Sequence, residues 1–212
     1  MTDFLSNGPE DAVATLLLAH GAGAGMESPF MVQMAALLAD RSVRTLRFEF
    51  DYMAARRNGG KRKPPPRAQL LSGEYKSAVA NAVGLTPRPR RLFIGGKSMG
   101  GRVASFVADE LFEAKTSNGL VCIGYPFHPP KKPDQLRTDH LMTMRCPALI
   151  VQGVRDPFGT REEVESYALS AAIRYHWADD GDHDLGPRGA SGFTRKGNLA
   201  AAADAVAAFV RP

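Results

Sequence analysis

Among the residues of this sequence, Ser98 has the neighbours that most clearly indicate a reactive side chain. It is the central residue of the segment GKSMG at 96–100, which follows the apolar run at 92–94 and precedes a helical pattern over 102–115. A chain that turns at once from a strand into a helix strains the central residue, and side chains at the flanking positions would collide with neighbouring elements, so glycine is needed there. The spacing G-x-S-x-G therefore predicts a serine nucleophile on a sharp strand-to-helix turn.

The glycine-rich segments resemble two nucleotide-binding motifs, but in each case the sequence lacks a glycine that the motif requires. A phosphate-binding loop that ends at Lys97 and Ser98 needs glycine at position 91, where Arg91 stands. A dinucleotide fingerprint that begins at Gly21 needs glycine at position 26, where Met26 stands. We therefore expect no cofactor.

A serine nucleophile requires a base, and the base requires a carboxylate that orients it. Asp156 is the only acid in the loop after the predicted strand at 148–153, and Pro157 stiffens the backbone beside it. Open α/β sheets place their sites at such strand ends. The alternative role for Asp156 is to cap the next helix.

His183 is the predicted base among five histidines. It directly follows the last predicted strand, in the segment DDGDHD at 179–184, and its acidic neighbours favour the imidazolium form. His176 lies within that strand, and His20 is expected to order the loop beside it. A metal-binding loop is the alternative for the acidic segment, but the spacing fits no EF-hand, and we expect no metal.

Backbone N–H groups must stabilise the oxyanion that forms when the serine attacks a carbonyl. We expect one from Met99, the residue after the nucleophile. The second should come from the loop after the first core strand, where Ala22 is the first choice and Gly23 the second. Small residues in this loop let its backbone approach a substrate closely. Three further residues are expected to contact the substrate: Gly21, Met26 and His128.

The elements that must position these residues alternate along the chain. Apolar runs and alternating patterns predict strands, and helical spacing predicts helices. The strands are expected at 12–19, 43–50, 91–95, 120–124, 148–153 and 173–178, and the helices at 30–39, 72–83, 102–115, 161–172 and 198–210. Segments 51–67 and 125–145 are expected to be loops. The pattern predicts one α/β domain over 1–212, with a mainly parallel sheet of six to seven strands covered by helices on both faces.

Composition narrows the class of protein. No apolar run is long enough for a membrane span, the first ten residues do not resemble a signal peptide, and two cysteines do not make a disulfide framework, so we expect a cytoplasmic protein. The net charge is +5, and much of the excess lies in one proline-rich stretch that lacks the aromatic residues of a nucleic-acid reader. The stretch is either a solvated loop or a rim that attracts an anionic substrate or partner. Its basic residues are Arg56, Arg57, Lys61, Arg62, Lys63 and Arg67.

Four motifs together resemble the α/β-hydrolase superfamily: LLAHGAGAGM at 17–26, GGKSMGGR at 95–102, YPFHPP at 125–130 and GDHDL at 181–185. They are most similar to its small, lidless, dienelactone-hydrolase-like branch, in particular the group that contains testis-expressed protein 30 and a related subunit of a histone-acetyltransferase complex. The resemblance implies a triad of Ser98, Asp156 and His183. Dienelactone hydrolases use a cysteine nucleophile, so Ser98 departs from them and points to ester chemistry.

The sequence therefore predicts a serine hydrolase that cleaves a small acyl ester or thioester through an acyl-enzyme. The short connection at 125–145 leaves little room for a lid, which favours short or exposed acyl groups. Two alternatives remain open: a non-catalytic interaction module with the same fold, and an amide or peptide hydrolase or acyltransferase that uses the same residues. We expect no nucleic-acid or membrane partner.

Overall fold

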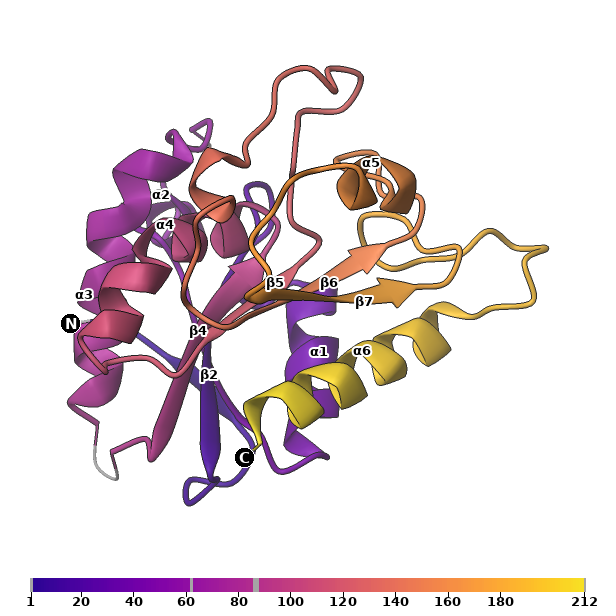
Figure 1. The fold of residues 1–212 in the computed structure, drawn as a ribbon. Coiled ribbons are helices and arrows are strands. Elements are labelled where there is room, and N and C mark those ends of the chain that lie inside the picture. Colours follow the sequence, from indigo (N-terminus) through magenta and orange to yellow (C-terminus); the bar gives the residue numbers. More distant parts are fainter. Residues whose placement is uncertain (1, 62, 86–87, 212) are drawn as a thin grey trace.

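Seven strands form one sheet in the order β1-β3-β2-β4-β5-β6-β7 (Figure 1). The computed structural model describes residues 2–61, 63–85 and 88–211. Strand β1 is antiparallel to β3, and every other neighbouring pair is parallel. The strands are β1 (Leu5–Asn7), β2 (Ala14–Ala19), β3 (Arg44–Phe48), β4 (Arg91–Lys97), β5 (Leu120–Ile123), β6 (Ala148–Gly153) and β7 (Ile173–Ala178).

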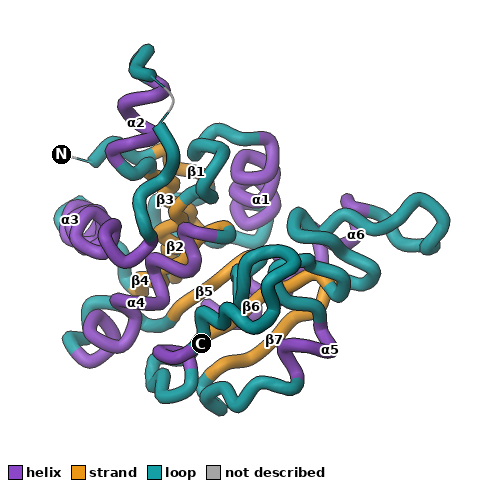
Figure 2. The backbone as a smooth tube through the Cα atoms, turned by 90° about the horizontal axis from the view of Figure 1, so that it is seen from above, coloured by secondary structure: helices purple, strands orange, loops and turns teal. Residues whose placement is uncertain are grey.

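Helices cover both faces of this sheet (Figures 1 and 2). All six residues of β2 are buried, and they alternate between two apolar clusters: Leu16 and Leu18 pack with α1 and α6, whereas Leu17 packs with α3 and α4. This is the burial expected of a central parallel strand. The α-helices are α1 (Pro29–Ala39), α2 (Asp51–Arg57), α3 (Ser72–Val83), α4 (Met99–Glu113), α5 (Arg161–Glu165) and α6 (Arg195–Val210).

The ends of several elements shift by up to three residues, and three elements differ more from the sequence prediction. The short strand β1 was not predicted, and residues 51–57, expected as loop, form α2 with Asp51 in the first turn and two arginines in the last, which complements the helix dipole. Helix α5 was expected to reach residue 172 but ends at Glu165. Its end coincides with Ser166, whose hydroxyl donates to the carbonyl of Glu163 at 2.6 Å, a local bond that competes with helical bonding.

The order of the strands determines where the site lies. From β2 the chain passes through α1 to β3 on one side, and then through α2 and α3 to β4 on the other side of β2. Ligands of open α/β sheets bind at such a switch point, outside the carboxyl ends of the strands. The loops after β2, β4, β6 and β7 all begin at this edge.

The connection from β5 to β6 contains one short 3₁₀-helix (Asp139–Leu141) and otherwise irregular structure, as predicted for 125–145. A second 3₁₀-helix (Ala68–Leu71) precedes α3. Within the described part of the chain, no helix is long and apolar enough to cross a membrane.

Candidate active site

Ser98 occupies a strained turn between β4 and α4. Its φ of 52° and ψ of −116° are sparsely populated by residues other than glycine, and such strain persists only where surrounding structure imposes it. The Ser98 N–H donates to the carbonyl of Ile123 on the neighbouring strand at 2.8 Å. The half-buried side chain is held at the carboxyl edge of the sheet.

The two glycines of the motif permit close backbone packing. A Cβ on Gly96 would lie 2.4 Å from the carbonyl carbon of Gly100, and a Cβ on Gly100 would lie 2.5 Å from the carbonyl oxygen of His20. Neither approach is possible for a real Cβ without moving backbone. The reason for the G-x-S-x-G spacing is therefore visible in the packing.

Ser98, His183 and Asp156 form one hydrogen-bonded chain. His183 Nε2 lies 2.9 Å from Ser98 Oγ, and His183 Nδ1 lies 2.8 Å from Asp156 Oδ2. This is the geometry in which an imidazole accepts the serine proton while a carboxylate fixes its tautomer and orientation. The ring of Phe158 packs against His183, with the ring centroids 4.3 Å apart.

Asp156 is completely buried and held by hydrogen bonds. Its Oδ1 accepts from the backbone N–H of Phe158 at 2.9 Å, and its Oδ2 accepts from the amide of Gln152, also at 2.9 Å. The helix-capping alternative does not hold, because Thr160 caps α5. A buried, hydrogen-bonded carboxylate that faces one imidazole is suited to orient a base.

The loop after β2 lies directly beside the serine. An ideal Cβ on Gly21 would be 3.7 Å from the Cβ of Ser98. Three successive carbonyls of this loop accept hydrogen bonds from side chains. Gly21 accepts from His20 Nδ1 at 2.6 Å, Ala22 from Tyr52 Oη at 3.0 Å, and Gly23 from Arg56 Nη1 at 3.4 Å. In a trans peptide the N–H points away from the carbonyl, so these contacts fix the directions of the Ala22 and Gly23 N–H groups.

His20 orders the start of this loop, as predicted. Burial lowers the pKa of its imidazole. In the neutral ring Nδ1–H donates to Gly21, and Nε2 accepts from the backbone N–H of Phe50 at 3.2 Å.

Lys97 is a residue that the sequence interpretation missed. Its side chain is only 8% exposed, although it lies next to Ser98 in the chain. Its Nζ donates to the backbone carbonyl of His183 at 2.9 Å, lies 3.1 Å from Asp184 Oδ1, and is 5.2 Å from the ring centroid of Phe30. Burial lowers the pKa of the ammonium, and the Asp184 carboxylate opposes that effect. Lys97 thus connects the turn at Ser98 to the loop that carries His183.

Two cavities adjoin Ser98. One, of about 520 Å³, is also lined by Ala22 and Met99, the two predicted oxyanion donors. The other, of about 410 Å³, is also lined by Ala22, together with Gly21, Gly23 and His183. The structure therefore brings the triad, both predicted donors, Gly21 and Gly23 to one place.

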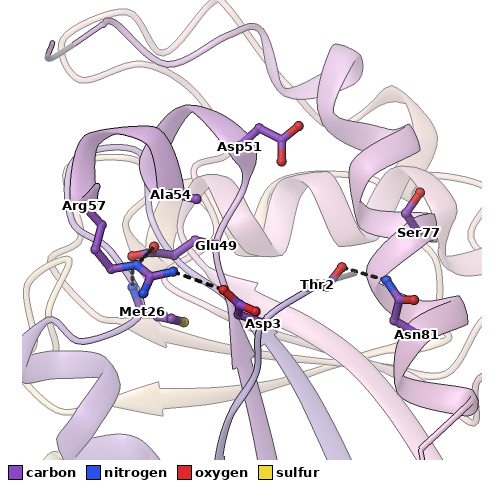
Figure 3. A pocket seen from close by; sticks show the side chains of 9 residues that line it. All are labelled: Thr2, Asp3, Met26, Glu49, Asp51, Ala54, Arg57, Ser77 and Asn81. Atoms are coloured by element: carbon purple, nitrogen blue, oxygen red, sulfur yellow. Dashed lines mark hydrogen bonds and ion pairs between the residues drawn. The ribbon is translucent and has the colours of Figure 1, made fainter. Parts of the chain in front are cut away.

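Met26 and His128, the other two predicted substrate contacts, lie elsewhere. Among the described residues that line the two cavities, neither occurs. Met26 is 2% exposed and borders a separate polar pocket of about 260 Å³, where its N–H donates to Glu49 (Figure 3). His128 is 3% exposed and faces Glu163, with 3.5 Å between His128 Nε2 and the carboxylate.

The acidic residues beside His183 have structural partners. Asp180 pairs with Arg155 at 2.8 Å and accepts from Arg188 Nε at 2.9 Å. Asp182 accepts from the backbone N–H groups of Asp184 and Gly186, at 2.9 and 2.8 Å. These contacts hold the loop that presents His183.

The family model of the α/β hydrolase domain matches residues 12–211, and the chain therefore belongs to the α/β-hydrolase family. A dienelactone hydrolase from Anabaena variabilis is 20% identical, with a TM-score of 0.71 over 99% of this chain and 96% of that chain. Est1E from Butyrivibrio proteoclasticus is 12% identical, with a TM-score of 0.68 over 99% and 98%. A serine hydrolase without a lid from Xanthomonas campestris is 17% identical, with a TM-score of 0.62 over 87% and 81%. At these identities the similarity defines the fold and not the substrate.

Proposed function

We propose that the protein is a serine hydrolase that cleaves small acyl esters or thioesters through an acyl-enzyme. The observation that carries this proposal is the continuous chain from Ser98 Oγ through His183 to buried Asp156, with successive distances of 2.9 and 2.8 Å. Hydrogen-bonded serine, imidazole and carboxylate form the activation system of serine hydrolases on several unrelated folds.

In the first half-reaction His183 Nε2 takes the proton of Ser98 Oγ as the oxygen attacks the acyl carbon. The N–H groups of Met99 and Ala22 are the proposed donors to the resulting oxyanion. His183 then protonates the leaving oxygen or sulfur, and the bond from the acyl carbon to the leaving group breaks. In the second half-reaction His183 deprotonates a water, which attacks the acyl-serine ester and releases the acid and free Ser98. Asp156 stabilises the imidazolium in both halves.

The open surroundings of Ser98 favour short acyl groups. The β5–β6 connection, which could supply a lid, is mostly irregular and short. We also place the chain in the lidless subgroup similar to testis-expressed protein 30, on the four motifs described above. A site without a lid cannot enclose a long alkyl chain, so burial of extra methylenes should add little to binding.

Hydrolysis of p-nitrophenyl acetate, butyrate and octanoate tests the proposal. We expect kcat/KM to be highest for the two shorter esters and to fall by about 10⁴-fold in Ser98→Ala. Ser6→Ala, a change at an exposed serine of β1, is the matched control and should keep the wild-type value. If Ser98→Ala still hydrolyses all three esters, Ser98 is not the nucleophile. A wild-type preference for the octanoate ester would refute the prediction that the site is open and takes short acyl groups.

A further inference from the structure

The cavity of about 520 Å³ beside Ser98 contains an unusual set of charges. Three arginines line it: Arg67 before α3, Arg102 in the first turn of α4, and Arg137 in the β5–β6 connection. Among the described residues that line it, none is an aspartate or a glutamate. We call this space the arginine cavity. The second cavity, whose charged lining residues include Lys97, Arg195 and Asp184, differs because it contains a carboxylate, which is paired with Lys97.

Two of the three guanidinium groups are partly withdrawn from water. Arg102 Nε is buried and has no hydrogen-bond partner in the described structure. The guanidinium carbon of Arg102 lies 5.4 Å from the ring centroid of Phe106. Burial lowers the pKa of Arg137, and the positive charge of Arg102 lowers it further. Like charges that are desolvated together are unfavourable in the free protein, and the attraction of an anion that binds between them offsets this cost.

The position of the base indicates which part of a substrate each cavity receives. His183 must protonate the leaving group, and it lines the cavity of about 410 Å³. The leaving group therefore belongs on that side. Ala22 lines both cavities, whereas Met99 lines only the arginine cavity, which is therefore left for the acyl part.

We propose that the arginine cavity binds a carboxylate carried by the acyl group, so that the preferred substrates are monoesters or monothioesters of short dicarboxylic acids. This proposal rests on the proposed function. Arg102 and Arg137 hold the distal carboxylate while Ser98 attacks the ester carbonyl at the other end of the acyl chain. One water is consumed, the acyl C–O or C–S bond breaks, and the products are a dicarboxylate and an alcohol or thiol. Arginine suits this role because its planar fork pairs with both carboxylate oxygens.

The test compares two esters that differ at the far end of the acyl chain: mono-p-nitrophenyl adipate, which is anionic, and p-nitrophenyl hexanoate, which is neutral. After correction for spontaneous hydrolysis, we expect the wild-type kcat/KM to favour the adipate ester by about tenfold or more, the effect of one or two charged hydrogen bonds. The ratio should fall to about one in the double variant Arg102→Met/Arg137→Met. The control Arg145→Met removes an exposed arginine that is paired with Glu113, and it should keep the wild-type ratio.

A wild-type ratio of one or less, or a ratio that the double variant leaves unchanged, would overturn the proposal. Because the double variant changes half-buried residues, the single variant Arg67→Met, at an exposed position, gives a second measurement with little effect on folding. It should lower the ratio by about two- to fivefold, the effect of one exposed charge.

Binding to Ser98→Ala separates failure of this proposal from failure of the proposed function. Calorimetry would compare monomethyl adipate, which is anionic, with neutral dimethyl adipate. One outcome would retain the anion site and refute the hydrolase assignment. In that outcome the wild-type protein hydrolyses neither p-nitrophenyl ester, but Ser98→Ala binds monomethyl adipate at least about tenfold more tightly than dimethyl adipate. Addition of Arg102→Met and Arg137→Met to Ser98→Ala would then abolish this preference. Equal binding of the two adipates refutes the anion site.

Discussion

Replacement of Lys97 by methionine should separate activity from stability. The ammonium is almost completely buried between the nucleophile turn and the base loop, where it donates to the carbonyl of His183 at 2.9 Å and lies 3.1 Å from Asp184. Methionine has a similar length and no charge. The change therefore removes the connection between the two loops and retains most of the packing against Phe30.

The structure sets the expected magnitudes. A hydrogen bond from a charged group contributes about 1.5–3 kcal/mol, so loss of the tie to His183 should lower kcat/KM by about 10- to 100-fold through misplacement of the imidazole. The free energy of unfolding should change by only about 1 kcal/mol, because the variant no longer desolvates an ammonium. The other partner, Asp184, has a side chain that is 61% exposed and stays hydrated.

The assay combines p-nitrophenyl butyrate kinetics with urea unfolding of the same preparations. Lys76→Met is the matched control, because Lys76 is an exposed lysine that pairs with Glu110 at 3.2 Å, and its loss should alter neither quantity appreciably. The reasoning is wrong if Lys97→Met keeps wild-type kcat/KM. It is also wrong if the variant loses more than about 3 kcal/mol of stability, since Lys97 would then be a structural residue.

Three further predictions concern the elements around the site. Tyr52→Phe removes the hydroxyl that holds the Ala22 carbonyl at 3.0 Å, and kcat/KM should fall about fivefold with a small change in stability, as kinetics and urea unfolding will show. Gly100→Ala places a Cβ 2.5 Å from a backbone oxygen and should destabilise the fold by about 3 kcal/mol or more, whereas Gly73→Ala, in open space on α3, should not destabilise it. Burial lowers the pKa of His140 from 6.5 to about 4, so the unfolded chain binds its proton first and stability falls as the pH drops below 6.5. Between pH 7 and pH 5 the wild type should lose about 1–2 kcal/mol more than His140→Gln in urea unfolding, and equal losses would contradict the assignment.

The three side chains of the proposed triad could be predicted because each carries a local signal at a strand end. Glycines on both sides of Ser98 mark the turn, and Asp156 and His183 lie in the loops that follow the last two strands of the sheet. The parallel sheet itself followed from apolar runs such as β2, which is buried along its whole length. These features depend on residues that are close together in the chain, so they can be recognised from the sequence alone.

The supporting contacts could not be predicted, because they join segments that are far apart in the chain. Lys97 stands at a variable position of the G-x-S-x-G motif, and nothing local shows that it reaches the carbonyl of His183. Helix α2, which carries Tyr52, buries only Met53 and so shows no apolar period. Met26 was among the predicted substrate contacts, but it is only 2% exposed, and its carbonyl accepts from buried Arg47 at 2.6 Å.

The central claim is that Ser98 is a nucleophile activated by His183. Its most direct test is reaction of the wild-type protein with a fluorophosphonate probe, followed by mass spectrometry of the intact protein and of its peptides. We predict one probe per chain, attached to the peptide that contains Ser98, with labelling abolished in Ser98→Ala and strongly slowed in His183→Ala. An unlabelled wild-type protein, or a label on any other residue, would contradict the account.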